Sequence, residues 1–255
     1  MRKFGLIGYP LLHSFSQGFF TEKFLQENIT DAVYQNYPIE DIASCKLLWA
    51  ENAELQGLNV TIPHKKSVIP FLDKPSSVVQ AIQACNCIRK FNGAYYGYNT
   101  DVIGFEKSLV PFLQPMHTAA LILGTGGAAA AVEWVLKKLA IPYQFVSRSG
   151  SISTTERATT ISYAQLTPTI IAQHKLIINT SPLGMFPNEQ QAPEIPYEAI
   201  TTQHHLYDLI YNPAETVFLK NGAAKGASTQ NGLAMLHIQA EESWKIWNAP
   251  TPLLQ

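Results

Sequence analysis

The chain has 255 residues, of which 46% are hydrophobic and 15% are charged, and its formal net charge at pH 7 is -1. This composition is typical of a globular protein with a sizeable core. It excludes a disordered chain and the broad basic surface that attracts nucleic acid. No apolar run approaches 18 residues, so the sequence predicts no membrane span.

The apolar start of the chain first suggests a signal peptide, but a glycine, a tyrosine and a proline at residues 8–10 interrupt it. No small-residue cleavage site follows, so we expect a first strand that ends in a turn. The only cysteines are Cys45, Cys85 and Cys87. An odd, small number with such close spacing favours buried thiols in a reducing cytoplasm over disulfides or a zinc site.

Strand-like and helix-like segments alternate through the first hundred residues. We expect strands at 4–8, 32–39 and 55–60, and helices at 17–26, 41–52, 65–72 and 75–84. Two β-rich segments then flank Asn92-Gly93, the strongest short signal of a hairpin. Alternation of this kind predicts βαβ units and a mostly parallel sheet.

A second alternating pattern begins near residue 102. We expect helices at 102–113, 127–140 and 232–247, strands at 119–124, 143–148, 175–181 and 205–211, and a Ser/Thr-rich loop at 150–160. The sequence therefore predicts an α/β protein with two domains and a boundary near residues 101–104.

A glycine-rich turn joins a strand to a helix in "LILGTGGAAAAVEWVLKKLA", which begins at residue 121. Gly124, Gly126 and Ala129 fit the spacing G-x-G-x-x-A. The first glycine permits the tight turn, the second lets the backbone approach a pyrophosphate, and the small third residue lets the helix pack on the sheet. A turn without a ligand is the alternative, but the flanking strand and helix favour dinucleotide binding.

The end of the next predicted strand reads "QFVSRS" and contains no carboxylate. A cofactor without the 2′-phosphate usually binds an acidic residue at this position. Here Arg148 lies between Ser147 and Ser149, and a guanidinium with two hydroxyls suits a 2′-phosphate. This favours NADP over NAD, although a surface arginine after a strand is a common alternative.

Polar residues cluster at predicted strand ends in the first half, where ligands bind in open α/β sheets. The stretch "LNVTIPHKKSV" places lysines at the start of a predicted helix, where a cation is unfavourable. Each polar residue alone has an ordinary explanation as a helix cap, a turn residue or a solvated side chain. The residues of interest are Ser14, Ser16, Asn59, Thr61, Lys65, Asn86 and Asp101.

Eight ordered motifs cover nearly the whole chain: "IGYPLLHSFSQGFF", "GLNVTIPHK", "ACNCI", "GYNTDVIGF", "LGTGGAAAA", "INTSPLGM", "YDLIYNPAETVFL" and "GLAMLHIQAEESW". With these motifs the chain resembles shikimate dehydrogenases. The resemblance implies reversible NADPH-dependent reduction of 3-dehydroshikimate to shikimate, in the shikimate pathway of aromatic amino acid biosynthesis. It also implies a substrate-binding domain at 1–101 completed by a C-terminal helix at 232–255, a Rossmann-type NADP-binding domain at 102–231, and an active-site cleft between them.

The resemblance also implies roles for individual residues. Lys65 and Asp101 would form the catalytic pair, because ketone reduction builds negative charge on oxygen and needs a proton donor. A carboxylate beside Lys65 would hold the ammonium charged, so the sequence leaves open which member moves the proton. The substrate-binding residues would be Ser14, Ser16, Asn59, Thr61, Asn86, Tyr211 and Gln239. The cofactor-binding residues would be Gly124, Gly126, Gly127, Ala128, Ser147, Arg148, Ser149, Thr180, Met185 and Gly232.

Three positions depart from the family pattern. Gln17 stands where a proline commonly follows the second serine, Ala130 replaces a basic residue, and Ser147 replaces an asparagine. The last two changes could weaken NADP binding or relax the preference toward NAD. The alternatives are an NAD-dependent quinate/shikimate dehydrogenase and a catalytically silent NADP-binding regulator. We expect a cytoplasmic monomer or homodimer that binds a small-molecule substrate and no metal, membrane or nucleic acid.

Overall fold

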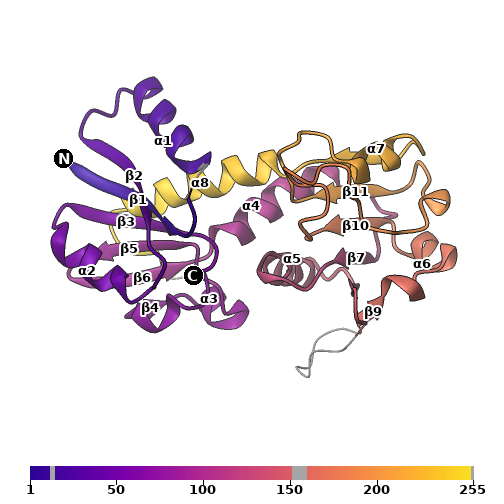
Figure 1. Ribbon diagram of the computed structural model, residues 1–255, viewed down its shortest axis with the longest axis horizontal. Coiled ribbons are helices and arrows are strands. Elements are labelled where there is room, and N and C mark those ends of the chain that lie inside the picture. The colour runs from indigo at the N-terminus through magenta and orange to yellow at the C-terminus, as the bar shows by residue number, and fades with distance from the viewer. Residues whose placement is uncertain (12–14, 151–159, 254–255) are drawn as a thin grey trace. The chain divides into compact units, whose positions relative to one another are not determined.

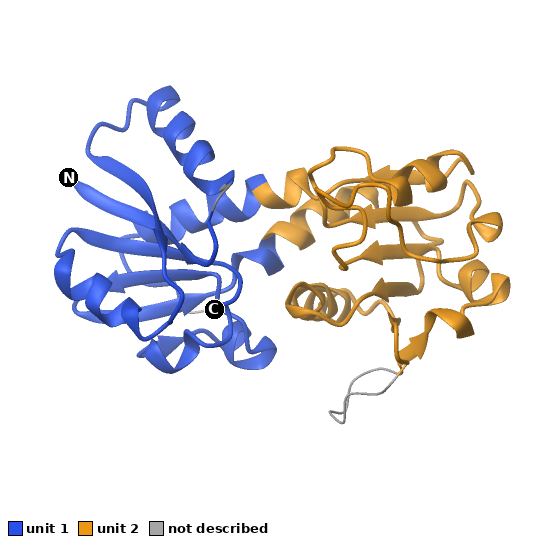
Figure 2. Ribbon diagram, in the orientation of Figure 1, with its two compact units in different colours: residues 1–103, 237–255 blue, residues 104–236 orange. Residues whose placement is uncertain are grey.

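The computed structural model describes residues 1–11, 15–150 and 160–253 (Figure 1). The chain forms two compact units, which we call unit 1 (residues 1–103 and 237–255) and unit 2 (residues 104–236) (Figure 2). The boundaries between them fall inside the helices α4 (Thr100–Leu109) and α8 (Leu233–Asn248), a few residues beyond the boundaries expected from the sequence.

Unit 1 contains a six-stranded sheet in the order β2-β1-β3-β5-β6-β4. Its strands are β1 (Arg2–Gly8), β2 (Ala32–Pro38), β3 (Leu55–Val60), β4 (Lys74–Pro75), β5 (Cys87–Phe91) and β6 (Ala94–Tyr98). Strand β5 runs antiparallel to both of its neighbours, and the other three strand pairs are parallel, so the sheet is mixed. The connection from β3 to β5 holds the 3-10 helix η1 (Ile69–Phe71), β4 and the short helix α3 (Ser77–Ile82). A two-residue turn joins β5 to β6, and strands joined by so short a turn pair antiparallel.

The predicted hairpin joins β5 to β6. Asn92 and Gly93 both have positive φ, 48° and 79°, and Phe91 pairs with Ala94 beside the turn. Positive φ at both central residues is what a two-residue hairpin turn requires. The hairpin prediction is confirmed.

The last helix completes the core of unit 1. Trp247 of α8 stacks on Phe4 with ring centroids 4.9 Å apart, and its indole N–H donates to the Ile88 carbonyl at 2.9 Å. A Cβ at Gly57 would collide with the Trp247 indole, so only glycine permits this close approach. The helices of this unit also include α1 (Phe15–Gln26) and α2 (Ser44–Glu51).

The prediction of a helix at 65–72 is wrong, because residues 62–68 form turns that lead into a 3-10 helix, η1 (Ile69–Phe71). The Lys65 carbonyl accepts the N–H of Cys85 at 2.7 Å, which diverts it from helical hydrogen bonding. Pro70 also lacks the N–H that a regular helix needs. The helix predicted at 75–84 is present but shorter, as α3, and the strand β4 lies just before it.

Unit 2 contains a fully parallel sheet in the order β12-β11-β10-β7-β8-β9. Its strands are β7 (Ala120–Leu123), β8 (Tyr143–Ser147), β9 (Thr160–Ser162), β10 (Leu176–Asn179), β11 (His205–Asp208) and β12 (Ser228–Gln230). Its helices include α5 (Gly127–Lys138), α6 (Pro168–Gln173) and α7 (Val217–Ala223). The strand order reverses between β7 and β10, and ligands bind at such a switch point, outside the carboxyl ends of the strands.

Several elements of unit 2 are absent from the prediction, namely β9, β12, α6 and α7. Most of the predicted loop at 150–160 lies outside the described residues. Among the helices of the described ranges, none is long and apolar enough to cross a membrane.

Candidate active site

Lys65 and Asp101 form an ion pair in unit 1. The Lys65 Nζ lies 2.7 Å from the Asp101 Oδ2, and the two side chains are 31% and 16% exposed. Asp101 lies in the first turn of α4, where the partial positive charge of the helix N-terminus stabilises a carboxylate. The pair is therefore held in place yet open to a ligand, whereas the neighbouring Lys66 is exposed.

The histidine beside this pair has a structural role. His64 is buried, and its Nε2 lies 2.7 Å from the Ile39 carbonyl oxygen. Because a carbonyl oxygen can only accept, the Nε2 carries the hydrogen. This contact fastens the turn that carries Lys65 to the segment after β2.

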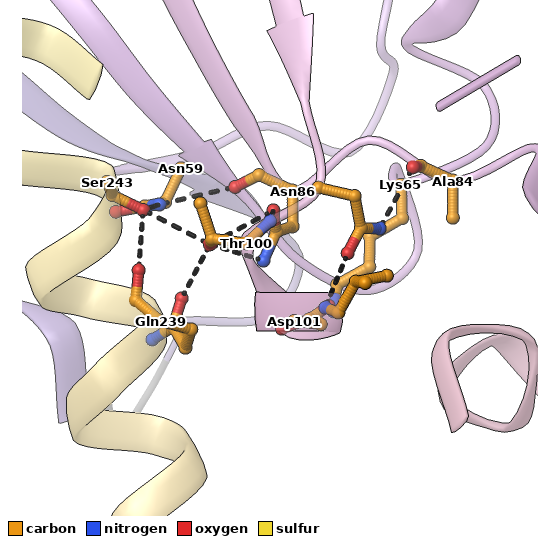
Figure 3. A network of polar contacts seen from close by, with 10 residues as sticks. Asn59, Lys65, Ala84, Asn86, Thr100, Asp101, Gln239 and Ser243 are labelled. Atoms are coloured by element: carbon orange, nitrogen blue, oxygen red, sulfur yellow. Dashed lines mark hydrogen bonds and ion pairs between the residues drawn. The ribbon is translucent and has the colours of Figure 1, made fainter. Parts of the chain in front are cut away.

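Polar side chains from four segments meet in unit 1, and we call them the amide cluster (Figure 3). Its members are Asn59, Asn86, Thr100, Gln239 and Ser243, and all five are buried. The Asn59 Nδ2 donates to the Asn86 carbonyl at 3.2 Å and to the Ser243 hydroxyl at 2.9 Å. The Asn59 Oδ1 accepts from the Tyr34 hydroxyl at 2.9 Å.

Thr100 connects the remaining members. Its backbone N–H donates to the Asn86 Oδ1 at 2.7 Å, and its hydroxyl accepts from the Asn86 Nδ2 at 3.0 Å. The same hydroxyl oxygen lies 3.4 Å from the Gln239 Oε1 and 3.3 Å from the Ser243 Oγ. Three predicted substrate-binding amides are thus brought together next to Asp101, which follows Thr100 in the chain.

The other predicted substrate-binding residues are placed differently. Ser14 lies outside the described residues. Ser16, on α1, hydrogen-bonds to Tyr34 and so joins the amide cluster indirectly, while burial raises the pKa of Tyr34 well above its usual value. Thr61 is half-buried just after β3, and Tyr211 lies exposed in unit 2.

Unit 2 contains a cavity of about 410 Å³ at the glycine-rich turn. Gly124 has φ +112°, and a Cβ there would lie 2.9 Å from the Thr180 Oγ1. Gly126 caps α5, and a Cβ there would meet nothing within 4 Å. The turn therefore exposes its backbone to the cavity, as a bound pyrophosphate would require. The lining residues are Gly124, Thr125, Gly126, Val146, Ser147, Arg148, Tyr163, Thr180, Ser181, Pro182 and Leu183.

Arg148 lines this cavity together with Tyr163, a residue that the sequence did not indicate. Burial raises the pKa of Tyr163 to about 12, against the opposing effect of the Arg148 charge, so the guanidinium acts on the phenol. The Ser147 hydroxyl accepts from the Gly150 N–H at 3.1 Å. A phosphate at this position would meet a guanidinium and no carboxylate from the lining residues.

The remaining predicted cofactor residues are not among those that line the cavity. Gly127 and Ala128 open α5, and Ser149 is exposed next to Arg148. Met185 is about half exposed. A Cβ at Gly232 would collide with the Leu209 carbonyl oxygen, so this position requires glycine for steric reasons.

A buried carboxylate supports one wall of the cavity. Asp208 accepts from the Thr216 hydroxyl at 2.7 Å and from the Asn179 Nδ2 at 3.1 Å, and burial raises its pKa to about 6. The Asn179 Oδ1 in turn accepts from the N–H and the hydroxyl of Ser181, at 3.0 and 2.7 Å. The lining turn at 181–183 is thus fixed from behind. Within the described parts of the chain, no three His, Cys, Asp or Glu side chains gather to hold a metal ion.

Comparisons with known proteins agree with this arrangement. A profile of the shikimate dehydrogenase substrate binding domain matches residues 6–88. The chain is 34% identical to the NADP(+) shikimate dehydrogenase of Desulforamulus reducens, over 97% of this chain and 90% of the relative. It is 35% identical to that of Carboxydothermus hydrogenoformans, over 97% and 92%.

Among solved structures, the chain is similar to the shikimate 5-dehydrogenase of Thermus thermophilus in complex with NADP(H) and shikimate. The TM-score is 0.83 at 26% identity, covering 99% of this chain and 95% of the other. The fold and the site define a dehydrogenase with a Rossmann-type unit. The chain belongs to the shikimate dehydrogenase family.

Proposed function

We propose that this protein is an NADP-dependent shikimate dehydrogenase, which reversibly reduces 3-dehydroshikimate to shikimate. The observation that carries the proposal is the Lys65–Asp101 ion pair, at 2.7 Å, next to three amide side chains that can hold a hydroxylated ring. Family membership at 34% identity over nearly the full length supports it. A pure binding protein has no evident need for a partly exposed lysine–carboxylate pair in this position.

The residues present fit NADP, which when bound supplies or accepts the hydride. Arg148 would hold the 2′-phosphate, and the backbone at Gly124 and Gly126 would face the pyrophosphate. Gly127, Ala128, Ser149, Thr180, Met185 and Gly232 remain proposed members of the same site.

The chemical step needs a proton at the oxygen of the reacting carbonyl. Hydride addition to the ketone carbon places the electron pair of the C=O π bond on oxygen, and one proton then completes the alcohol. The Lys65 ammonium would stabilise that oxygen and deliver the proton. Asp101 accepts a hydrogen bond from Lys65 and so orients it. In the reverse direction the same pair receives the proton.

The substrate would be held by neutral polar groups. Ser14 and Ser16 would bind its carboxylate, and Asn59, Thr61, Asn86, Tyr211 and Gln239 would contact its hydroxyls. Neutral donors hold an anionic substrate without placing a second full positive charge near the reacting oxygen.

The test is a comparison of initial rates with NADP+ and NAD+, each with shikimate and with quinate, followed by the absorbance of the reduced nicotinamide. We expect strong turnover only with NADP+ and shikimate. Turnover with NAD+ or quinate would retain the Lys65–Asp101 pair but overturn the proposed specificity. A lack of turnover with all four pairs would reject the enzyme and favour a silent regulator.

We also propose a cytoplasmic location and a monomer or homodimer. The free, buried state of Cys45, Cys85 and Cys87 is compatible with a reducing compartment. Sedimentation or light scattering of the purified protein would give the number of chains.

A further inference from the structure

The orientation of two amide side chains in the amide cluster is fixed by backbone groups. The Asn59 Nδ2 lies 3.2 Å from the Asn86 carbonyl oxygen, which can only accept, so the nitrogen and not the oxygen must face it. The Asn86 Oδ1 lies 2.7 Å from the Thr100 N–H, which can only donate. If either amide rotated by half a turn, an oxygen would face a carbonyl oxygen or an N–H would face another N–H.

With its orientation fixed, Asn59 has one hydrogen-bonding function left. Both of its N–H groups are used, one by the Asn86 carbonyl and one by the Ser243 hydroxyl. Ser243 can accept that hydrogen because its own hydroxyl hydrogen goes to the Gln239 carbonyl at 2.9 Å. Tyr34 occupies one lone pair of the Asn59 oxygen. Among the described residues nothing takes the second lone pair, so Asn59 can only accept from a ligand.

Asn86 has the opposite capacity. Its oxygen accepts from the Thr100 backbone, and one of its two N–H groups goes to the Thr100 hydroxyl at 3.0 Å. Its second N–H has no acceptor within the part of the chain that the structure describes. Asn86 therefore remains able to donate one hydrogen bond to a ligand.

We propose that the Thr100 and Ser243 side chains are positioning groups that hold the two amides in this orientation, so that Asn59 accepts from a substrate hydroxyl and Asn86 donates to a substrate oxygen. Both residues are fully buried, so they act through the amides and do not touch the substrate themselves. The inference rests on the proposed function and adds a direction to each contact. Thr100 also places its single hydroxyl hydrogen among three acceptors, on Asn86, Gln239 and Ser243, and so couples the three.

A site of this kind selects ligands by the direction of their hydrogen bonds. A ring carrying a hydroxyl donor opposite Asn59 and an oxygen acceptor opposite Asn86 satisfies both residues. A ligand with the opposite pattern leaves a buried polar group unpaired, which is costly. Loss of the Thr100 hydroxyl would leave the first Asn86 N–H without its acceptor, so the amide would be held by the Thr100 backbone N–H alone and its second N–H would no longer be aimed at the substrate.

The test compares Thr100→Val, which keeps the shape but loses the hydroxyl, with Thr100→Ser, which keeps the hydroxyl. We expect Thr100→Val to raise the KM for shikimate about tenfold while the KM for NADP+ stays unchanged, since one buried hydrogen bond is lost. Thr100→Ser should stay within about twofold of the wild type, since it retains that bond. A purely structural role would lower the thermal unfolding midpoint of Thr100→Val without this separation of the two KM values.

A double-mutant cycle tests whether Thr100 acts through Asn86. In an Asn86→Ala background, Thr100→Val should change kcat/KM by less than about twofold, because the partner is already gone. Ser243→Ala, measured with and without Asn59→Ala, gives an independent second cycle if Thr100→Val does not fold. Full additivity in the cycles, or equal KM values for Thr100→Val and the wild type, would overturn the proposal.

Wild-type turnover in the same assay separates this proposal from the proposed function. If the wild type does not turn over shikimate, the dissociation constant of shikimate, measured by calorimetry, replaces KM in the same cycles. Absence of both turnover and binding in the wild type would overturn the two proposals together. Normal wild-type kinetics with additive cycles would overturn the positioning role alone.

Discussion

The candidate sites of the two units differ in the chemical groups that form them. In unit 1 the site consists of side chains, with the Lys65–Asp101 pair and a set of amides joined by side-chain hydrogen bonds. In unit 2 the cavity is formed at a glycine turn and the carboxyl ends of parallel strands, where Gly124 and Gly126 have no side chain to cover the backbone. A side-chain site depends on single atoms, whereas a backbone site depends on conformation and on the space that glycine leaves.

This difference matches the chemistry proposed for each unit. A pyrophosphate presents many equivalent oxygens, which the N–H groups at a helix N-terminus can meet without regard to side chains. A polyhydroxylated ring must be held in one orientation at the reacting carbon, which needs donors and acceptors in a fixed direction. Substitutions in the site of unit 1 should therefore change the catalytic rate. Substitutions at the turn of unit 2 should change cofactor binding or stability.

The largest effect is expected for Lys65→Ala. Removal of the ammonium takes away both the proton and the charge at the reacting oxygen, so kcat should fall by about 10³-fold. Shikimate binding, measured by calorimetry, should stay within a few-fold, because the amides remain. The matched control is Lys66→Ala, which changes an exposed neighbour and should leave kcat unaltered.

A large loss of binding by Lys65→Ala with a modest loss of rate would contradict a catalytic role. A similar fall in Asp101→Asn, with Lys65 intact, would show that the carboxylate is needed to orient the lysine. Such a result would make the ion pair, and not the lysine alone, the functional group.

The next effect concerns stability in acid and is confined to unit 2. His205 is fully buried, and burial lowers its pKa from 6.5 to about 4. Above pH 6.5 it is neutral in both the folded and the unfolded chain, so stability is lost only as the pH falls from 6.5 to 4. This lowering of the pKa corresponds to about 3 kcal/mol of unfolding free energy. Burial also lowers the pKa of His117 and of His204, which adds to this loss.

The buried carboxyl of Asp208 opposes this trend. Its pKa is raised from 3.8 to about 6, so its protonation favours the folded chain as the pH falls through this range. Urea unfolding at pH 7 and pH 4.5 would measure the balance. We expect His205→Gln to show a smaller loss of stability on acidification than the wild type. Identical losses in both proteins would contradict burial of a neutral histidine.

The prediction from sequence was best where the signal is local. The glycine turn, Arg148 and the Asn92-Gly93 hairpin are each encoded within a few residues, and the structure has the expected turn at Gly124 and the expected hairpin. The family resemblance supplied the pairing of Lys65 with Asp101, which spacing alone could not give. A short local pattern was therefore enough to predict the turn and the hairpin.

The prediction failed where distant segments decide the structure. The Lys65 carbonyl bonds to Cys85, twenty residues along the chain, and no local pattern reveals that this prevents a helix. Thr100 and Ser243 meet across 143 positions, and a buried threonine or serine has no periodicity of its own. Only the adjacency of Thr100 to Asp101 in "YNTD" could have pointed to it.

Arg148→Ala should weaken NADP+ much more than NAD+. The guanidinium is expected to pair with the 2′-phosphate, and loss of a charge-assisted hydrogen bond of this kind corresponds to about tenfold or more in KM. The NAD+ kinetics provide the internal control, because that cofactor has no 2′-phosphate. Equal losses for the two cofactors would place the arginine away from the phosphate and leave the NADP preference without this explanation.

The smallest effects separate the two glycines of the turn. Gly124→Ala should lower the unfolding free energy by about 1–3 kcal/mol, because φ is +112° and the new Cβ would press on Thr180. Gly126 has an ordinary φ of -78°, and a Cβ there would meet open space, so Gly126→Ala should not lower the thermal unfolding midpoint. Its KM for NADP+ should nevertheless rise, because the added methyl lies where the pyrophosphate approaches the backbone. An unchanged KM in Gly126→Ala would show that the cofactor does not approach the turn at this residue, and the cavity would then bind it through Arg148 and the strand ends alone.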